Sequence, residues 1–206
     1  MTTPSSVLNS VVISRFSPHD DRASMPELIR CYQNVFADPP WNEHKRCGVC
    51  GKYWGRLEHL RSNIAEHCGK PVVDFWSADV VESNICSEVG HEASCWVARL
   101  NGEIVGFCWG YPLGLEVLDQ KLQLAGVSGA VRSHFGNLER VAFQNEVGVV
   151  EELRGQKIAK KFFQHRLNDF LEGGLTVGVV RTRRSPEPSV TYLWFTQKLG
   201  YTEVAA

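Results

Sequence analysis

Short runs rich in apolar, β-branched and aromatic residues predict the strands of this chain. They cover residues 11–16, 94–100, 103–111, 140–150 and 175–181, and a further short strand is expected near 201–204. Asn101-Gly102 separates the second run from the third. Asn-Gly between two strand-like runs is typical of a β-hairpin, so we expect these two strands to be antiparallel neighbours.

Apolar residues at helical spacing predict the first helix within residues 24–36. Ser24 and Glu27 form a capping-box pattern at its start, and Pro26 occupies the first turn, where its missing N–H costs nothing. Pro39-Pro40 ends the helix. The apolar positions that repeat are Leu28, Ile29, Tyr32, Val35 and Phe36.

Three later segments also have helical signals. A helix capped by Ser77 is expected over residues 76–85, and another over 189–199 that ends at Gly200. The longest is amphipathic and covers residues 154–171, and Gly173-Gly174 ends it. Its predicted apolar face consists of Ile158, Phe162, Leu167 and Leu171.

The order of these elements predicts the fold class. Strand, helix, polar insertion, helix, hairpin, strand, helix, strand and helix indicate a mixed α/β (α+β) domain in which early antiparallel pairing is followed by a strand–helix–strand crossover. Residues 42–74, which are polar and rich in Cys and His, are interpreted as an insertion after the first helix. Residues 114–136 are ambiguous, with a helical pattern over 115–124 and a Gly/Ser-rich loop pattern after it.

Composition narrows the class of protein. The 206 residues, 43% of them hydrophobic, suit one domain, 1–206, with an insertion and a sizeable core. The net charge of -1 gives no general attraction for nucleic acid or an anionic membrane. No apolar run approaches membrane-spanning length, and residues 1–10 lack the basic and apolar regions of a signal peptide. We therefore expect a cytoplasmic protein with neither nucleic acid nor membrane as a partner.

The junction at residues 145–162 carries the main chemical signal. A predicted strand ends there, Arg154-Gly155 lies in a short turn, and a helix begins at once. The first amides of a helix have no internal partners, and together with the helix dipole they form a site for anions. Glycine lets an anion approach the backbone closely. A phosphate or pyrophosphate is the natural ligand of such a junction.

This junction resembles that of the GNAT superfamily of acyl-CoA-dependent N-acyltransferases. The family's motif at this junction is Arg/Gln-x-x-Gly-x-Gly/Ala, after a strand that often carries a glutamate. Residues 154–159, RGQKIA, match the outer positions, and Lys157 stands at the central glycine. Residues 194–201, WFTQKLGY, are similar to the FYEKLGF end of the family's last helix, and 101–110 to its second-to-third strand hairpin.

Residues 35–43 also look like the segment that closes the first helix in some members. The resemblance covers most of residues 11–204, except 42–74. It implies a GNAT-like, mixed but mainly antiparallel central sheet flanked by helices, and it implies acetyl-CoA as co-substrate.

In this family acyl-CoA lies where the fourth and fifth strands splay. The resemblance implies that the backbone of Gly148, Val149 and Val150 pairs with the pantetheine arm. The amides that would hold the pyrophosphate belong to Arg154, Gly155, Gln156, Lys157, Ile158 and Ala159. Lys157 adds bulk where the backbone approaches phosphate, and it also adds a positive charge beside the anion.

The resemblance further implies transfer of the acetyl group to a primary amine by direct attack in a ternary complex. Glu146 is the candidate general base, and a side chain that points to solvent is the alternative. The family's tyrosine acid falls on Thr196. Tyr192, one helical turn earlier, is the candidate acid in its place, with water as acid and Tyr192 as a core residue as the alternatives.

Thr196 and Lys157 leave two other interpretations open. One is a GNAT-fold domain that binds acyl-CoA without transferring the acyl group, and the other is a zinc-dependent interaction module on an α/β scaffold. The family's usual last strand has no room after residues 201–204. A second copy of the chain would then complete the sheet edge in a homodimer, or the edge stays open.

A second chemical signal is CGVCGKYWG at residues 47–55. One alignment matches a Cys-Cys-His-His zinc finger at Cys47, Cys50 and His67, with Cys68 directly after His67. Another matches two halves of a zinc ribbon. Both keep Cys47 and Cys50. The other ligands are His67 and Cys68 in the preferred set, with His59 or His44 as the alternatives.

A closed site with four ligands is structural, because it leaves no position open for catalysis. In a small polar insertion without a core of its own, zinc contributes directly to folding. The alternative is a degenerate site that no longer binds metal. A single finger with little positive charge offers too little surface to read DNA. We hypothesise that the insertion, which precedes the second helix, shapes the acceptor site.

Overall fold

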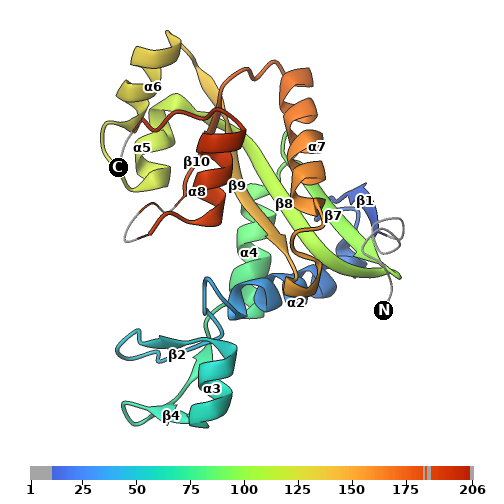
Figure 1. The fold of residues 1–206 in the computed structure, drawn as a ribbon, viewed down its shortest axis with the longest axis vertical. Coiled ribbons are helices and arrows are strands. Elements are labelled where there is room, and N and C mark those ends of the chain that lie inside the picture. Colours follow the sequence, from blue (N-terminus) through green and yellow to red (C-terminus); the bar gives the residue numbers. More distant parts are fainter. Residues whose placement is uncertain (1–10, 183, 185–186, 205–206) are drawn as a thin grey trace.

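The computed structural model describes residues 11–182, 184 and 187–204; residues 1–10, where no signal peptide is expected, lie outside them. Its centre is a five-stranded sheet with the strand order β1-β7-β8-β9-β10 (Figure 1). Neighbouring strands are antiparallel except for β10, which runs parallel to β9. The predicted mixed, mainly antiparallel sheet is confirmed. The strands are β1 (Val11–Arg15), β7 (Ser94–Leu100), β8 (Glu103–Gly114), β9 (Arg140–Val149) and β10 (Gly178–Val180).

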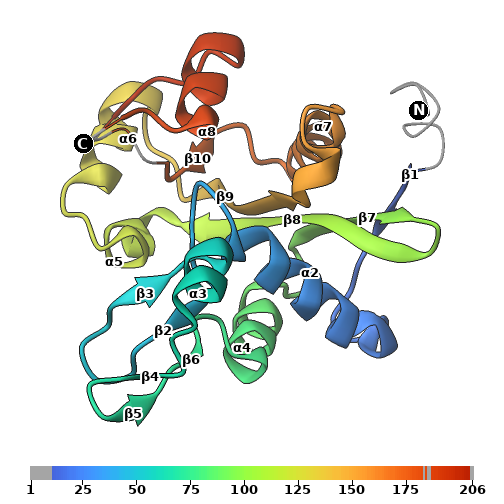
Figure 2. The same ribbon diagram turned by 60° about the horizontal axis from the view of Figure 1, so that its bottom comes forward.

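Helices cover both faces of this sheet. Figure 2 shows α7 (Ile158–Glu172) on one face and α2 (Met25–Ala37) with α4 (Ala78–Glu88) on the other. Because side chains alternate along a strand, Phe107 of β8 is buried against α2, whereas Cys108 is buried on the side of α7. None of the described helices combines the length and the apolar character needed to cross a membrane.

The start of α2 differs from the predicted capping box. Ser24 occupies the N-cap position, but its side chain makes no capping hydrogen bond. Instead, Arg99 Nη2 donates to Ser24 Oγ (3.0 Å), and Glu27 accepts from Arg99 Nη1 and from the Ile104 amide (both 2.8 Å). The Ser24 and Glu27 side chains therefore form hydrogen bonds with the β7–β8 hairpin instead of capping the helix.

The Gly/Ser-rich segment that was expected to be a loop is helical. After a 3-10 turn and α5 (Leu118–Leu122), it forms α6 (Val127–Phe135). Val127 and Val131 are buried in the small core that covers this end of the sheet. The Asp119 carboxylate accepts from the Gly126 and Ser128 amides (2.8 and 2.7 Å), which supplies partners that the sequence pattern did not reveal.

The long helix also departs from its predicted limits and face. α7 begins at Ile158, not at 154, because Gly155 and Lys157 have positive φ values that an α-helix does not contain; a separate 3-10 turn, Glu151–Leu153, precedes them. Ile158 and Phe162 are buried as predicted, but Leu171 is 60% exposed. The face against the sheet is instead completed by Phe163, Arg166 and Phe170.

The last helical segment is short and packs on α7. It comprises α8 (Val190–Leu193) and a π-helical turn over Trp194–Lys198, so the predicted helix over 189–199 is confirmed in outline. Ser189 caps it by accepting from the Tyr192 amide (3.0 Å). Phe195 is buried and lies 5.7 Å from Phe163 of α7, measured between ring centroids. Residues 201–204 form no strand.

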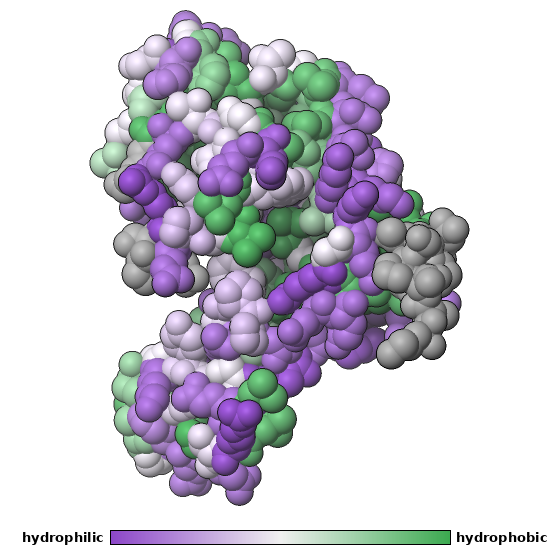
Figure 3. Space-filling view, in the orientation of Figure 1, coloured by the Kyte–Doolittle hydropathy of each residue, from purple (hydrophilic) through white to green (hydrophobic). Residues whose placement is uncertain are grey.

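Residues 42–74 form a small lobe of their own, set apart from the sheet (Figures 1 and 3). Trp54 is its largest buried side chain, at 1% exposure. The Arg56 guanidinium joins the lobe to the end of α2 through Asp38 (3.2 Å) and Asn34 (3.1 Å). Its elements are β2 (Lys45–Arg46), β3 (Tyr53–Trp54), α3 (Arg56–Ser62), β4 (Glu66–His67), β5 (Lys70–Pro71) and β6 (Val73–Asp74).

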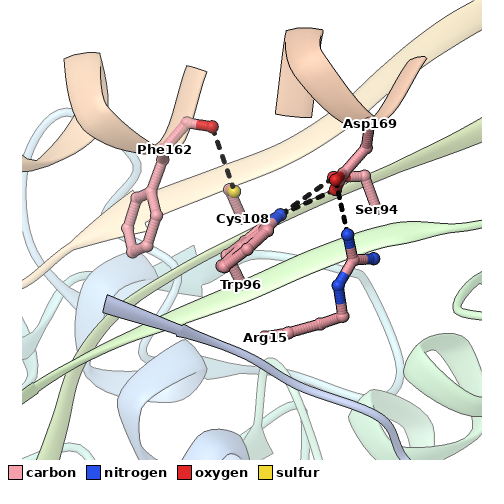
Figure 4. Close-up of polar contacts among 6 residues, drawn as sticks. All are labelled: Arg15, Ser94, Trp96, Cys108, Phe162 and Asp169. Atoms are coloured by element: carbon pink, nitrogen blue, oxygen red, sulfur yellow. Dashed lines mark hydrogen bonds and ion pairs between the residues drawn. The ribbon is translucent and has the colours of Figure 1, made fainter. Parts of the chain in front are cut away.

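Asp169 fastens α7 to the sheet. Its carboxylate accepts from the Ser94 hydroxyl, from Trp96 Nε1 (2.9 Å) and from the Arg15 guanidinium, as Figure 4 shows. Ser94 is buried at 1% exposure, so its hydroxyl has no access to water as a substitute partner. The carboxylate therefore satisfies polar groups on both β1 and β7 with a single side chain.

Replacing Asp169 should destabilise the protein. Asp169→Ala leaves the buried Ser94 hydroxyl without its acceptor and Trp96 Nε1 with only the Ser94 oxygen (3.1 Å), which should lower the free energy of unfolding by about 2–4 kcal/mol. Urea denaturation measures this. Asn168→Ala, on the exposed side of the same helix, is the control and should change stability by less than about 0.5 kcal/mol. Equal effects of the two substitutions would contradict an anchoring role for Asp169.

Candidate functional site

β9 contains a bulge next to the point where it parts from β10. Trp109 of β8 pairs with Glu146, and the next residue, Gly110, pairs with Gln144, so Asn145 is the extra residue. Pairing between β9 and β10 ends at Gln144 and Val180. From the bulge to its end, β9 is therefore bonded to β8 on one side, and none of the described strands pairs with it on the other.

The backbone of this stretch presents polar groups to the unpaired side. The Val150 amide donates to the Val105 carbonyl (3.0 Å), so the alternation of an antiparallel ladder turns Gly148 towards β8 and Val149 away from it. Of the three predicted pantetheine partners, Val149 is the one whose backbone faces the unpaired side; its carbonyl already accepts from Arg154 Nε (3.2 Å), which leaves its amide to offer. Packing explains why residue 148 is a glycine, because a Cβ there would lie 2.5 Å from the Phe107 ring and 2.9 Å from the Val35 side chain.

Arg154 lies at the predicted junction but does not point its side chain at a free ligand site. Its guanidinium donates to the carbonyls of Val149 (3.2 Å), Pro39 (2.8 Å) and Val35 (3.4 Å). Its backbone amide donates to the Glu151 carbonyl (3.1 Å), and the Gln156 backbone amide donates to the Leu153 carbonyl (3.4 Å). Arg154 thus joins the end of α2 to the end of β9, and two of the predicted junction amides are used within the turn.

The start of α7 keeps free amides. The first bond inside this helix runs from the Lys161 amide to the Lys157 carbonyl (3.1 Å), so the amides of residues 158–160 have no acceptor in the helix. Gly155 and Lys157 have φ values of +79° and +64°, in the left-handed region. Lys157 therefore adopts the conformation that a glycine would adopt there, and its charged side chain is exposed next to those of Lys160 and Lys161. Ile158 is buried and Ala159 is half-buried.

The Glu146 side chain lies on the opposite side of β9 from α7, among acidic and aromatic residues. Burial raises the pKa of its carboxyl to about 8, and the neighbouring Glu88 and Glu43 carboxylates add to the rise. The Arg181 and Arg166 guanidinium groups oppose it. No ion pair engages Glu146 within the described part of the chain, so this carboxyl has an affinity for protons suited to a base near neutral pH.

Glu43 and Glu88, which sequence analysis did not select, flank Glu146. Glu43 accepts from Trp76 Nε1 (2.8 Å), and burial raises its pKa. Glu88 of α4 accepts from Trp109 Nε1 (2.9 Å), from Asn145 Nδ2 (2.7 Å) and from Lys121 (2.8 Å). Glu88 thus holds the bulge residue Asn145 in place. Tyr32 of α2 packs beside these groups, 5.9 Å from Trp109 and 5.6 Å from Trp76 between ring centroids.

Arg166 is a further residue that the sequence analysis missed. It is 2% exposed and donates through Nη1 to the carbonyls of Trp109 (3.1 Å) and Glu146 (3.0 Å). Its Nη2 donates to Gln144 Oε1 (2.8 Å). The signal in the sequence was its spacing, because Arg166 lies four residues after Phe162 and four before Phe170, in the middle of the buried face of α7.

Tyr192 and Thr196 lie on the wall of an open cavity of about 1160 Å³ that borders β10. The Tyr192 hydroxyl donates to Glu203 (2.8 Å), and this hydrogen bond raises the pKa of the phenol. The Thr196 hydroxyl donates to the Tyr192 carbonyl (2.8 Å). No hydrogen bond of the described residues joins either side chain to Glu146.

The four predicted metal ligands come together in the insertion. One ligand atom from each of Cys47, Cys50, His67 and Cys68 lies within 4.8 Å of the other three. His67 Nδ1 is 3.5 Å from Cys50 Sγ and 3.2 Å from Cys68 Sγ. A tetrahedral zinc ion with ordinary bond lengths would separate a sulfur and a nitrogen ligand by about 3.6 Å. Three cysteines and one histidine at these distances fit zinc.

A tight turn presents the first two of these cysteines. The Cys47 amide donates to the Lys52 carbonyl (2.7 Å), and the Gly51 amide donates to the Cys47 carbonyl (3.0 Å). Gly51 has a φ of +75°, which favours glycine at this position. Backbone amides of Cys50 and Val49 point at the Cys47 sulfur and lower the pKa of its thiol to about 6. Such amides stabilise a thiolate ligand.

His44 and His59, the alternative ligands, lie outside this group. Their rings contact each other, with centroids 5.3 Å apart. Burial lowers the pKa of His44. Within the described chain the metal-ligand group therefore consists of the preferred set and excludes both alternatives.

The raised pKa of Glu146 should make stability depend on pH. Between about pH 5 and 8 the folded protein keeps a proton that the unfolded chain, with a glutamate pKa of about 4.3, has lost. Stability should therefore fall as pH rises through this window, and Glu146→Gln should remove on the order of 1–3 kcal/mol of that fall. Denaturant unfolding at a series of pH values measures it. The exposed Glu139→Gln is the control, and parallel pH curves for both variants would contradict the prediction.

Comparison with known proteins places this arrangement in a known fold. No protein-family model matches the sequence, and neither does the sequence of any curated protein. Solved structures match over nearly the whole chain. The aminoglycoside N-acetyltransferase AAC(6')-Iy in complex with CoA has a TM-score of 0.55 at 11% identity, with 95% of this chain and 90% of that chain covered.

Two further matches are N-acetyltransferases of other kinds. The polyamine N-acetyltransferase of Drosophila melanogaster has a TM-score of 0.55 at 15% identity, covering 93% of this chain and 83% of its own. The ribosomal-protein-alanine N-acetyltransferase of Brucella melitensis has a TM-score of 0.52 at 14% identity, covering 95% and 96%. The chain therefore has the fold of the GNAT N-acetyltransferases.

Proposed function

We propose that this protein is an N-acetyltransferase that transfers the acetyl group of acetyl-CoA to a primary amine. One observation carries the proposal: Glu146, with its raised pKa, lies on the bulged strand two residues past Gln144, where β9 loses β10 as its partner. The fold supports it, because solved structures with this fold include one that holds CoA.

Acetyl-CoA would lie along the unpaired side of β9. The backbone of Val149 would pair with the pantetheine arm in place of a strand, and the free amides of residues 158–160 would bind the pyrophosphate. Lys157, Lys160 and Lys161 are exposed around these amides and add positive charge for the phosphates. Arg154 would serve this site indirectly, since its guanidinium fixes the turn that precedes the helix.

Glu146 would remove a proton from the attacking ammonium group, directly or through water, so that the neutral amine attacks the thioester carbonyl. A carboxyl with a pKa near 8 is matched to an alkylammonium better than an ordinary glutamate is. The N–C bond forms, the C–S bond breaks, and the electron pair leaves with the CoA thiolate.

The acceptor would be recognised as a cation. Glu43 and Glu146 present acidic groups next to the aromatic rings of Tyr32 and Trp76, and both acidic groups and aromatic faces attract ammonium ions. Structures with this fold include enzymes named for aminoglycosides and for polyamines. These two classes are the first acceptors to test.

Tyr192 is the candidate acid for the departing thiolate. Its hydroxyl is held by Glu203, which opposes proton donation, so solvent can take over this step. Tyr192→Phe should then lower kcat by less than about tenfold.

The experiment that tests the proposal combines acetyl-CoA calorimetry with turnover of a polyamine and an aminoglycoside. Glu146→Gln should bind acetyl-CoA within about threefold of the unmodified protein but lose about 10²–10⁴ in kcat, because only the base is removed. Glu139→Gln is the matched control and should keep full turnover. Failure of the unmodified protein to bind acetyl-CoA would exclude the proposal, whereas binding without turnover of any amine would favour an acyl-CoA-binding domain without transferase activity.

We also propose that Cys47, Cys50, His67 and Cys68 hold one structural zinc ion. The observation behind it is that these four side chains, from two separate turns of the insertion, converge to within 4.8 Å. All four positions of a tetrahedral ion would be filled by the protein, so the ion would supply stability and no open site for substrate. The only buried side chains of the insertion belong to Cys47 and Trp54, which would make a metal the main source of its stability.

Zinc analysis should find one ion per chain. Cys50→Ser should remove it and loosen residues 42–74, measured as faster amide hydrogen exchange in that range, with acetyl-CoA affinity changed by less than about threefold. Cys86→Ser, another exposed cysteine, is the control and should keep the ion. Protein that folds normally without metal in zinc-replete buffer would show that the site is degenerate.

A further inference from the structure

The interior of the molecule holds a guanidinium group that no carboxylate contacts. Arg166 is 2% exposed, and its direct partners are two backbone carbonyls and the amide oxygen of Gln144. Within the described chain it forms no salt bridge. Burying a charge without a counter-ion is costly, so we expect the three hydrogen bonds of the guanidinium to have a role that a neutral side chain could not fill.

The position of the bulge in β9 indicates the role of these hydrogen bonds. The extra residue Asn145 shifts the register between Trp109 and Gly110, so the β8–β9 ladder is interrupted there. The Trp109 and Glu146 carbonyls both point into this gap, where Arg166 Nη1 donates to both at 3.1 and 3.0 Å. One guanidinium nitrogen thus joins a carbonyl of β8 to a carbonyl of β9 at the bulge, and the second of these belongs to the proposed base itself.

The other contacts of the bulge make its position definite. Arg166 also donates to the buried Gln144, whose amide group donates to the Tyr201 hydroxyl. From the opposite face of the sheet, Glu88 accepts from the Asn145 side chain (2.7 Å). The three consecutive residues 144–146 are therefore each held by a different bond. Gln144 is also the last residue of β9 that pairs with β10.

We propose that Arg166 is a positioning residue for acyl transfer, which holds the bulge that directs Glu146 towards the acceptor and keeps β9 parted from β10. This inference rests on the proposed function, because it concerns the same site. Arg166 touches neither substrate in this arrangement. It acts through the Glu146 backbone, and its loss should affect the base more than the binding of CoA phosphates at the start of α7.

The test compares Arg166→Met and Arg166→Lys with Arg15→Met. Arg15→Met removes another cation that anchors α7 to the sheet, through Asp169, at a distance from the bulge. Arg166→Met should lower kcat at least 100-fold while acetyl-CoA affinity changes less than about threefold. Arg166→Lys, whose ammonium group can still donate to both carbonyls, should recover about tenfold of the loss. Arg15→Met should leave kcat within about threefold.

A pH profile separates positioning from a loss of stability. The charged or titratable groups around Glu146 are Glu43, Glu88, Tyr32, Arg181 and Arg166. Removing the Arg166 charge leaves the acidic neighbours less opposed, so the acidic limb of the kcat profile should move to higher pH in Arg166→Met and stay in place in Arg15→Met. Unchanged kcat and an unchanged limb in Arg166→Met would overturn the inference.

Amide hydrogen exchange gives a readout that does not depend on activity. Peptides that cover residues 144–149 should exchange faster in Arg166→Met than in Arg15→Met, and Arg166→Lys should restore part of the protection.

If the unmodified protein turns over no amine, the proposed function fails while this comparison still decides whether Arg166 holds the bulge. Equal exchange in Arg166→Met and the unmodified protein would overturn the inference even where turnover is intact. If Arg166→Met does not fold, Arg166→Lys decides instead: a kcat about tenfold below that of the unmodified protein, with partial loss of protection of residues 144–149, would support the inference, and full kcat with full protection would overturn it.

Discussion

A buried guanidinium group connects the longest helix to the irregular part of the central sheet. Arg166 of α7 donates to one carbonyl of β8 and one of β9 at the bulge, and it also donates to Gln144. A buried guanidinium needs such acceptors, so these bonds hold the helix and the two strands together at the bulge. The place where β9 parts from β10, and hence the orientation of Glu146, depends on this one contact between a helix and two strands.

The start of α7 shows a second constraint. Residues 154–159 resemble a phosphate-binding junction, but two of the six amides bond within the turn and the Arg154 side chain bonds to α2 and β9. The amides at residues 158–160 remain free, because a helix cannot satisfy its own first donors. Lys157 accepts a left-handed backbone with a φ of +64°, so a substitution that departs from the usual glycine keeps the geometry of the turn. Its side chain adds positive charge to the same place.

The insertion follows a different principle from the sheet domain. The sheet domain is stabilised by apolar residues of α2, α4 and α7 packed on two faces, whereas the insertion buries few side chains and brings four metal-ligand residues together. Arg56 and Glu43 connect the two, the first through Asp38 and the second through Trp76. The acidic and aromatic residues beside Glu146 thus lie next to the root of the insertion, which is where a lobe that influences the acceptor would be attached.

The sequence by itself determined the elements with strong local signals. Asn101-Gly102 specified the hairpin and helical spacing specified α2 and α7, because each signal depends on neighbours a few residues away. Cys-x-x-Cys identified Cys47 and Cys50 as candidate metal ligands, and the fold brought His67 and Cys68 to them rather than the alternative histidines. Only the tertiary structure decided that Ser24 and Glu27 serve the hairpin and that the Gly/Ser-rich segment forms α6. It also decided that Arg166, Glu43 and Glu88 surround the site of Glu146. Most of these outcomes depend on contacts between residues far apart in the chain, such as Arg99 with Glu27 and Arg166 with Trp109, and local spacing carries no information about them. The start of α6 depends on the Asp119 carboxylate, which lies outside the helix itself.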